Sequence, residues 1–184
     1  MKVVGKQEIV VPTSVLEAVA SQDRVDEPPH NFYKYPARFS PVFAREVIKA
    51  FTRKGDTVID PFCGGGTSLV EAISLGRRAA GFDISSLAVF LTRTKTSPLS
   101  VHDKKEISAW LKIIGCIEEP NKRGSFGFTD EEVHYRRNLP ETARTFFESV
   151  IEMTKSLPKN RQKMFVRLVL LAIAGTSYTI LRSI

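Results

Sequence analysis

The sequence has few cysteines and few histidines. Only two cysteines occur among the 184 residues, Cys63 and Cys116, and their placement suits neither a disulfide framework nor a metal site. The histidines, His30, His102 and His134, are far apart in the chain and form no metal-ligand pattern. We therefore expect no bound metal and a reducing, cytoplasmic environment.

Marks of export and of membrane insertion are also absent. The first residues contain no apolar core followed by a small-residue cleavage site, so we expect no signal peptide. The most apolar stretch, MFVRLVLLAIAGTSYTIL, is interrupted by Arg167 and is shorter than the roughly 20 apolar residues of a membrane span. We expect this stretch to be a buried helix, and we expect no membrane partner.

Acidic residues are outnumbered by basic ones, 20 against 27, which gives a net charge of +7. Such an excess favours a polyanionic partner. Residues 153–184 contain no acid, and their basic residues are Lys155, Lys159, Arg161, Lys163, Arg167 and Arg182. This end of the chain is the expected nucleic-acid face, although a solvated helix face is an equally good reading.

Helices and strands alternate in the first half of the chain. A short helix is expected near the start, where Ser14 and Glu17 form a capping box, and a polar linker follows it. The later expected elements are a helix beginning at Ser40 and Pro41, a strand at 57–60, a helix at 68–75 capped by Gly76, a strand at 79–84, and a helix from Ser85 or Ser86 to about residue 96. This order is typical of the opening half of a doubly wound α/β domain.

Beyond Pro98 the apolar spacing is helical throughout. The expected helices span 103–117, 140–157 and 161–174. We therefore divide the chain into an N-terminal helix and linker (1–29), an α/β half-domain (30–97) and a helical region (98–184). Only two strands are predicted, whereas sheets commonly have about four to six. The predicted sheet is thus incomplete.

The stretch DTVIDPFCGGGTSLVE, residues 56–71, carries the clearest ligand signal. Its glycines, Gly64 to Gly66, follow a strand, where a Cβ would collide with a ligand or forbid a positive φ. Their spacing is not that of a dinucleotide fingerprint, and no lysine follows them as in a phosphate loop. Asp60 suits a ligand's ammonium group, and Asp83 suits ribose hydroxyls. These features fit S-adenosylmethionine; alternatively, the two acids only cap the turn and the next helix.

Three segments resemble motifs of the amino DNA methyltransferases, which methylate N6 of adenine or N4 of cytosine. DPFCGGGT (60–67) is similar to the cofactor-binding motif I, HNFYKYPARFSP (30–41) to motif X, and GFDIS (81–85) to motif II. The resemblance implies S-adenosylmethionine as the cofactor, DNA as the substrate and a partial Rossmann-like methyltransferase sheet. The cofactor-binding residues that it implies are His30, Tyr35, Pro36, Ala37, Arg38, Phe39, Asp60, Pro61, Phe62, Cys63, Gly64, Gly66, Thr67, Asp83 and Ile84.

Roles follow from the resemblance by position. Asp60 would meet the cofactor's amino group, Asp83 would hold the ribose, and Phe62 would pack near the sulfonium and the target base. The segment from Tyr35 to Phe39 would line the methionine side of the cofactor, unless it is only a loop packed by its aromatic residues. Cys63 is not expected to be a nucleophile, because the motif places no base beside it.

The family's catalytic motif, of the type D-P-P-Y, does not occur in the sequence, so no catalytic residue is assigned. In the family this motif follows a strand and holds the amino group of a flipped base. The nearest string, Glu27-Pro28-Pro29-His30, follows a polar linker and lacks both the required acid and the aromatic residue. We therefore expect the missing strands and motif on a second polypeptide of a split enzyme, or on a longer enzyme of which this chain is a fragment. Self-association is another way to cover the open sheet edge.

Other functions remain open from the residues alone. The chain fits an inactive cofactor-binding or regulatory subunit, and RNA is an alternative to DNA. The region 98–184 suits target recognition, with Lys122, Arg123, Arg136 and Arg137 on phosphates, or a helical lid that packs against the sheet and a partner.

Overall fold

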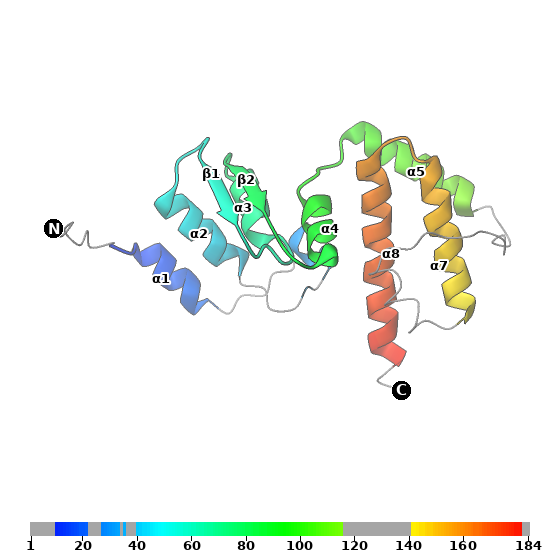
Figure 1. The fold of residues 1–184 in the computed structure, drawn as a ribbon, viewed down its shortest axis with the longest axis horizontal. Helices are drawn as coiled ribbons and strands as arrows, with labels where there is room; N and C mark the ends of the chain where they lie inside the picture. Colours follow the sequence, from blue (N-terminus) through cyan, green and yellow to red (C-terminus); the bar gives the residue numbers. More distant parts are fainter. Residues whose placement is uncertain (1–9, 22–26, 34, 36–39, 116–140, 182–184) are drawn as a thin grey trace.

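The computed structural model describes residues 10–21, 27–33, 35, 40–115 and 141–181. They form an α/β part and a helical part that lie side by side (Figure 1). The elements in chain order are α1 (Thr13–Ala20), a 3-10 turn η1 (His30–Phe32), α2 (Pro41–Phe51), β1 (Thr57–Asp60), α3 (Thr67–Ser74), β2 (Arg78–Gly81), α4 (Ser86–Lys95), α5 (Val101–Gly115), α7 (Glu141–Met153), a 3-10 turn η2 (Thr154–Ser156) and α8 (Asn160–Leu181).

Two helices begin where local sequence signals predict. At α2, the Ser40 hydroxyl oxygen accepts the Val42 N–H at 3.2 Å, and Pro41 occupies the first helical position. At α4, the Ser85 hydroxyl oxygen accepts the Ala88 N–H at 3.3 Å. Both predicted starts are confirmed, and Ser85 rather than Ser86 is the capping residue of α4.

The predicted capping box of α1 is wrong. The helix begins at Thr13, with Pro12 rather than Ser14 in the N-cap position, and no side chain caps it. The extended backbone of Pro12 places its carbonyl to accept the Val15 N–H at 3.0 Å, so the chain enters the helix before Ser14. The Ser14 side chain instead helps, after Lys49, to lower the pKa of Glu46 on α2.

The sheet consists of β1 and β2, which pair in parallel from Thr57 opposite Arg78 to Asp60 opposite Gly81. They are the only strands in the described residues. α3 connects them and ends in a Schellman motif, with the Gly76 N–H donating to Ile73 O and the Arg77 N–H to Ala72 O, both at 2.9 Å. Gly76 therefore caps α3 as predicted. β2 begins and ends earlier than predicted, because at Asp83 the chain turns to bond to the glycine turn and to Ser85.

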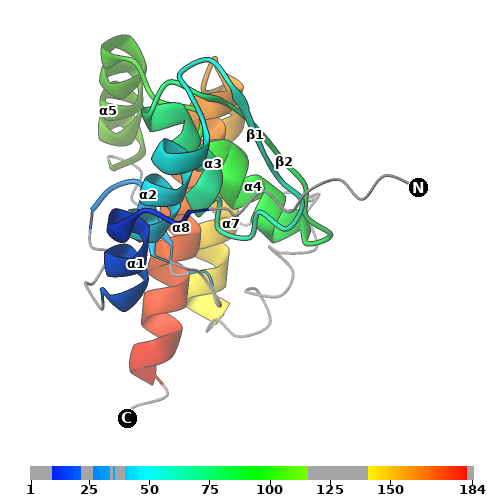
Figure 2. The same ribbon diagram turned by 90° about the vertical axis from the view of Figure 1, so that its left-hand side faces the viewer.

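Among the described residues, helices cover one face of the sheet and leave the other exposed. A Cβ at Gly81 would lie 2.6 Å from the Leu69 side chain, so this position faces α3. Strand alternation places Ile59 on the opposite face, where it is 64% exposed. Figure 2 shows α2 and α3 on one side of the strands. Parallel sheets are normally covered on both faces. The fold is therefore α/β with a partial Rossmann-like sheet, as predicted.

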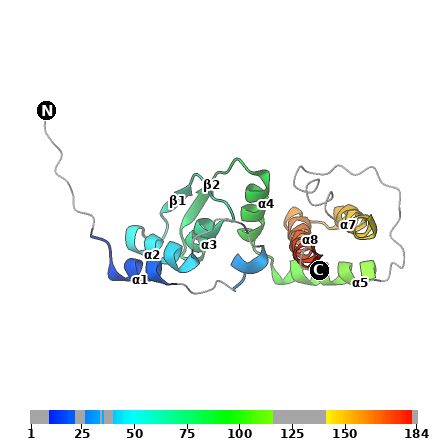
Figure 3. The ribbon, with the colours of Figure 1, turned by 90° about the horizontal axis from the view of Figure 1, so that it is seen from below.

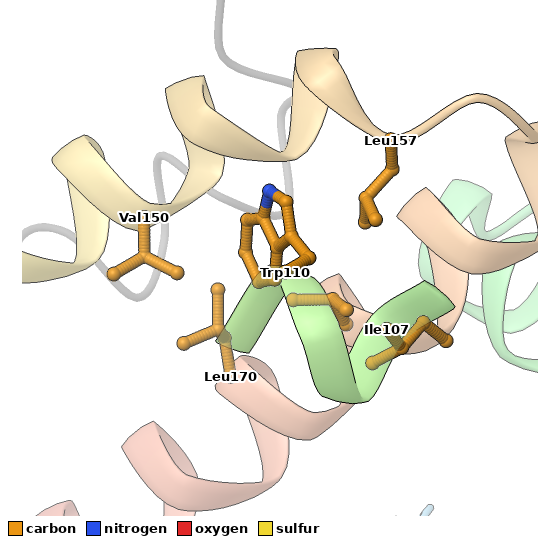
Figure 4. Packing of buried hydrophobic residues seen from close by; sticks show 6 residues of the cluster. Ile107, Trp110, Val150, Leu157 and Leu170 are labelled. Atoms are coloured by element: carbon orange, nitrogen blue, oxygen red, sulfur yellow. The ribbon is translucent and has the colours of Figure 1, made fainter. Parts of the chain in front are cut away.

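The helical part has its own core. Ile107 and Trp110 of α5 pack against residues of α7 and α8, and the indole lies among them (Figure 4). The Trp110 indole N–H donates to the Ser156 hydroxyl at 3.0 Å. In Figure 3, α7 and α8 are seen end-on and α5 lengthwise, so α5 crosses both. The remaining core residues are Val150, Leu157, Val166 and Leu170. None of the described helices is long and apolar enough to cross a membrane.

A buried carboxylate fixes α5 to the beginning of α8. Asp103 is 0% exposed and accepts bonds from Ser100 N and Oγ at 2.8 and 2.7 Å. Its other partners are Lys159 Nζ at 3.0 Å, Gln162 Nε2 at 3.1 Å and an Arg161 guanidinium nitrogen at 2.7 Å. Burial opposes the charge, but these partners hold the pKa of Asp103 well below its usual value.

Several helix boundaries in this part differ from the prediction. α7 ends at Met153 rather than 157, because the chain continues into the 3-10 turn η2. α5 starts at Val101 rather than 103, because Ser100 and Asp103 form a reciprocal cap in which the Asp103 N–H also donates to Ser100 Oγ. α8 continues to Leu181, beyond the predicted end at 174. The predicted buried helix is confirmed by Val166, Leu168 and Leu170, all less than 9% exposed.

Candidate functional site

The glycine turn lies between β1 and α3 and uses its glycines in two ways. Gly64 and Gly66 have φ values of 48° and 81°, and Gly66 caps α3 in the left-handed conformation. Gly65 has no positive φ, but a Cβ there would lie 3.0 Å from the Tyr35 Cβ. The protein's own tyrosine therefore crowds this position, independently of any ligand.

Helix α4 supports the turn from behind. The Thr92 hydroxyl donates to Gly64 O at 3.0 Å, and Lys95 Nζ donates to Gly65 O at 3.1 Å. Thr92 and Lys95 are 5% and 9% exposed. Sequence reasoning missed both residues, although their spacing of one helical turn places them on a common face. The turn is thus held by side chains from a helix that follows the second strand.

Asp60, at the end of β1, holds the near side of the turn. One of its carboxylate oxygens accepts the Phe62 N–H at 3.0 Å, and the other accepts the Ser68 hydroxyl. These bonds are those expected if Asp60 caps the turn. Asp60 is only half-buried, and each carboxylate oxygen has a second lone pair for a ligand.

Asp83 follows β2 and joins the two strand ends. It accepts the Ser85 N–H at 2.9 Å and the Gly64 N–H at 2.8 Å. These two backbone donors lower the pKa of Asp83, which is therefore ionised at neutral pH. The structure brings Asp60, the glycine turn and Asp83 together at the carboxyl edge of the parallel strands, where open α/β sheets bind ligands.

Apolar side chains project into solvent at this edge. Phe62 is 83% exposed, Phe82 64% and Ile84 102%, and Pro61 is also exposed. A group of exposed apolar side chains is typical of a binding surface. Phe62 and Ile84 were among the predicted site residues, whereas Phe82 was not.

Two predicted site residues lie inside the turn. Cys63 is 6% exposed, its N–H donates to Phe82 O at 3.0 Å, and burial raises the pKa of its thiol. A protonated, buried thiol is a poor nucleophile. Thr67, also 6% exposed, is the first residue of α3.

The predicted motif X residues divide into described and undescribed positions. His30 is 7% exposed and its Nε2 lies 2.8 Å from Glu71 Oε1 on α3. Tyr35 is half-buried beside Gly64 and Gly65. Residues 36–39 lie outside the described residues. Glu71 was not predicted as part of the site, because a glutamate one turn into a helix has no sequence feature that marks it as buried.

A separate cleft lies on the other side of Lys95. It has a volume of about 500 Å³ and is lined by Phe32, Leu99, Phe165 and other residues near α4, α5 and α8. None of the described predicted site residues lines it. In the described part of the chain, no group of three potential metal ligands occurs.

Several basic residues expected on nucleic acid have acidic partners. Lys159 and Arg161 pair with Asp103, and Lys155 pairs with Glu152 at 2.6 Å. At least three of the basic residues predicted for this end of the chain are thus paired with acids elsewhere in the protein. The predicted phosphate contacts Lys122, Arg123, Arg136 and Arg137, as well as Cys116 and His134, lie outside the described residues.

Comparison with known proteins identifies a similar family. Residues 5–94 match the family model of the N6/N4 methyltransferases, which is described as a DNA methylase. This segment of the chain is similar to the N6/N4 DNA methylase family. It contains both strands, the glycine turn and Asp83. The similarity to this methylase family implies a methyl-donor cofactor.

The individual proteins to which this chain is similar include both DNA and tRNA methyltransferases. The Type II methyltransferase M.MjaII of Methanocaldococcus jannaschii is 31% identical over 136 residues, 74% of this chain and 22% of the relative. M.MvaI of Kocuria varians is 36% identical over 73 residues, 38% and 16% of the two chains. A tRNA (guanine(10)-N2)-dimethyltransferase of Methanothermobacter thermautotrophicus is 35% identical over 89 residues, 47% and 26%. The chain thus spans about a quarter or less of each relative. No solved structure gives a significant match.

Proposed function

We propose that the chain is the S-adenosylmethionine-binding part of a DNA amino-methyltransferase that acts on N6 of adenine or N4 of cytosine. A D-P-P-Y-bearing polypeptide segment outside these 184 residues would supply the base-binding half. The observation that carries the proposal is the placement of Asp60, the glycine turn and Asp83 at one edge of a parallel sheet that lacks a phosphate loop.

The residues of the chain would bind and orient the methyl donor. Asp83, ionised by its backbone donors, would accept the ribose hydroxyls, and Asp60 would meet the ammonium group. Phe62, which is 83% exposed, would pack beside the sulfonium and the target base. When bound, the cofactor would supply an activated methyl group for the exocyclic amine, and no covalent intermediate on the protein would be needed.

The incomplete sheet supports the need for a second polypeptide segment. Ile59 is exposed on the face away from α3, and a two-stranded parallel sheet is not stable as an isolated unit. The missing segment would add strands and cover this face. Another chain, a longer version of this chain, or a second copy would each meet this structural need, but only the first two bring the D-P-P-Y motif.

Cofactor binding tests the first part of the proposal. Calorimetry with S-adenosylmethionine should show one site on the purified chain. Asp83→Ala should weaken binding by more than about 1 kcal/mol, the least expected for a charged hydrogen-bonding pair. Asp56→Ala is a matched control, because Asp56 is exposed just before β1 and its side chain accepts a local bond from the Arg53 N–H at 2.8 Å. Equal affinities of wild type and Asp83→Ala would remove the ribose assignment.

Methylation assays test the second part. The chain alone should transfer no methyl group to DNA, and a D-P-P-Y-bearing polypeptide from the same genome should restore transfer. Full activity of the chain by itself would refute the need for a partner segment. Cofactor binding without activity in the presence of that polypeptide would support the alternative of an inactive cofactor-binding or regulatory subunit.

RNA is the second candidate substrate. The sequence identity of 35% to a tRNA dimethyltransferase supports this alternative. Binding to duplex DNA and to tRNA at several salt concentrations distinguishes the two polymers. A DNA enzyme should bind DNA with a steep salt dependence, because phosphate contacts release counterions. Equal or tighter binding to tRNA, with methyl transfer to it, would favour the RNA enzyme.

A further inference from the structure

One buried carboxylate joins three elements around the candidate site. Glu71 lies on α3, the helix that begins at the glycine turn, and its side chain is 1% exposed. Its Oε1 is 2.8 Å from His30 Nε2 of η1, and Arg45 of α2 donates to Oε2 at 2.6 Å through Nε and to Oε1 at 3.3 Å through Nη2. We call these three residues the Glu71 clamp.

The clamp brackets Tyr35 in the sequence. His30 precedes Tyr35 and Arg45 follows it, and both bind the same carboxylate. Tyr35 in turn lies against the glycine turn: Cβ atoms added to Gly64 and Gly65 would be 3.4 and 3.0 Å from its side chain. The glycine turn that contacts Tyr35 leads directly into α3, the helix that carries Glu71. The segment around Tyr35 is therefore attached to α3 through His30 and Arg45, and to the turn before α3 through Tyr35 itself.

The charges around Glu71 keep it ionised. Burial alone would raise the pKa of Glu71, but the bonds from His30 and Arg45 outweigh this effect and lower the pKa. Arg45 also faces the acids Glu27 and Glu46, which together with Glu71 raise its pKa. A buried carboxylate that loses such partners is strongly unfavourable, so the clamp has little tolerance for partial opening.

We propose that Glu71 is a positioning residue of the cofactor site, which holds Tyr35 on the glycine turn by fixing η1 through His30 and α2 through Arg45. His30, predicted as a cofactor contact, acts through this carboxylate. The inference rests on the proposed function for its effect on S-adenosylmethionine and on the contacts above for its effect on Tyr35.

The test compares Glu71→Ala and Glu71→Gln with wild type in the full chain. Calorimetry should show S-adenosylmethionine binding about tenfold weaker in Glu71→Ala, because apparent affinity falls with the fraction of molecules in the binding arrangement. Glu71→Gln, which retains an oxygen that accepts hydrogen bonds, should lose less. Without cofactor, amide exchange should speed up in Glu71→Ala for peptides that contain Tyr35 and residues 64–70.

Asp103→Asn is the matched control. Asp103 is also a buried carboxylate with an arginine partner, but it lies in the helical part. This variant should lower stability while leaving both the cofactor affinity of the folded chain and the exchange at Tyr35 unchanged. Circular dichroism establishes that each variant is folded under the binding conditions. If Glu71→Ala does not fold, His30→Gln and Arg45→Met each release one side of the clamp and should give smaller shifts in both readouts.

The two readouts separate the inference from the proposed function. Wild-type affinity and wild-type exchange in the folded Glu71 variants, or in both single-sided variants, would overturn the clamp and leave the proposed function standing. In the opposite outcome, the wild-type chain binds no S-adenosylmethionine while Glu71→Ala still speeds exchange at Tyr35. This result would overturn the proposed function, and with it the role of Glu71 in cofactor binding, but it would leave the effect of the clamp on Tyr35 standing.

Discussion

Backbone strain and side-chain crowding at Gly66 can be separated by comparing its alanine substitution with those of Gly55 and Gly81, which lie outside the glycine turn. Gly66 has φ of +81°, and an added Cβ would lie 2.7 Å from Thr92 Oγ1 and 3.1 Å from the Thr92 Cα. Gly55 has a similar φ of +91° and nothing within 4 Å of the added atom. Gly81 has no positive φ, but its Cβ would lie 2.6 Å from Leu69 Cδ2. Gly55 thus reports backbone strain, Gly81 reports crowding, and Gly66 reports both.

The expected losses follow from these distances. A left-handed conformation costs an alanine about 1–2 kcal/mol, partly offset by the lower entropy of its unfolded chain, so Gly55→Ala should lose about 1 kcal/mol. Overpacking adds about 1–3 kcal/mol. At Gly66 the Thr92 hydroxyl cannot rotate away without losing its bond to Gly64 O. Gly66→Ala should therefore lose about 2–4 kcal/mol. Gly81→Ala should lose about 1–3 kcal/mol, because Leu69 has a flexible side chain.

Urea denaturation of the full chain, followed by far-ultraviolet circular dichroism, measures the free energy of unfolding of each variant. Equal losses for Gly66→Ala and Gly55→Ala would refute the packing of α4 against the turn. Cofactor affinity gives an independent ranking: Gly66→Ala should bind S-adenosylmethionine more weakly than wild type, whereas Gly55→Ala should not.

Three further perturbations test other parts of the structure. Asp103 has a depressed pKa in the folded chain, so its charge stabilises the fold above the ordinary aspartate pKa of about 4, and this contribution is lost as pH falls below that value. Asp103→Asn should therefore unfold at lower urea concentration than wild type at pH 7, with the difference shrinking from pH 4 toward pH 2. Trp110 is the sole tryptophan, and Trp110→Ala should lose about 3–5 kcal/mol in a thermal or urea melt, against a smaller loss for Trp110→Phe. In a Cys116→Ser background, Cys63 should react with a thiol reagent only at the rate of unfolding, and rapid labelling of the folded chain would contradict its burial.

Elements with local signals could be predicted from the sequence. Ser40 with Pro41, Gly76 and Ser85 set their helix boundaries through bonds to residues at most three positions away, or through the Schellman bonds of the same turn. The same applies to β1, which is bounded by the tight turn before Thr57 and the glycine turn after Asp60. Family resemblance adds the cofactor motif, but it does not show how the motif is supported.

Residues whose environment is made by distant partners could not be predicted. Glu71 is buried because Arg45 and His30, 26 and 41 positions earlier, converge on it. Asp103 is buried because Lys159 and Gln162, 56 and 59 positions later, fold back over it. Thr92 and Lys95 support the turn only after the crossover places α4 behind it. A single sequence carries no local sign of such convergence, since each residue is an ordinary helix residue in its own segment.

The bare face of the β1–β2 pair has a practical consequence for work with this chain in solution. Ile59 and the strand edges, which no other strand of the described residues pairs with, are a template on which further chains can add. Protein concentration is therefore an experimental variable like pH or salt: a chilled, concentrated stock should gradually form higher-mass species, and dilution or one acidic residue in place of Ile59 should slow their growth. Light scattering across a dilution series, measured alongside every titration, would separate the effect of a ligand on the chain from this self-association.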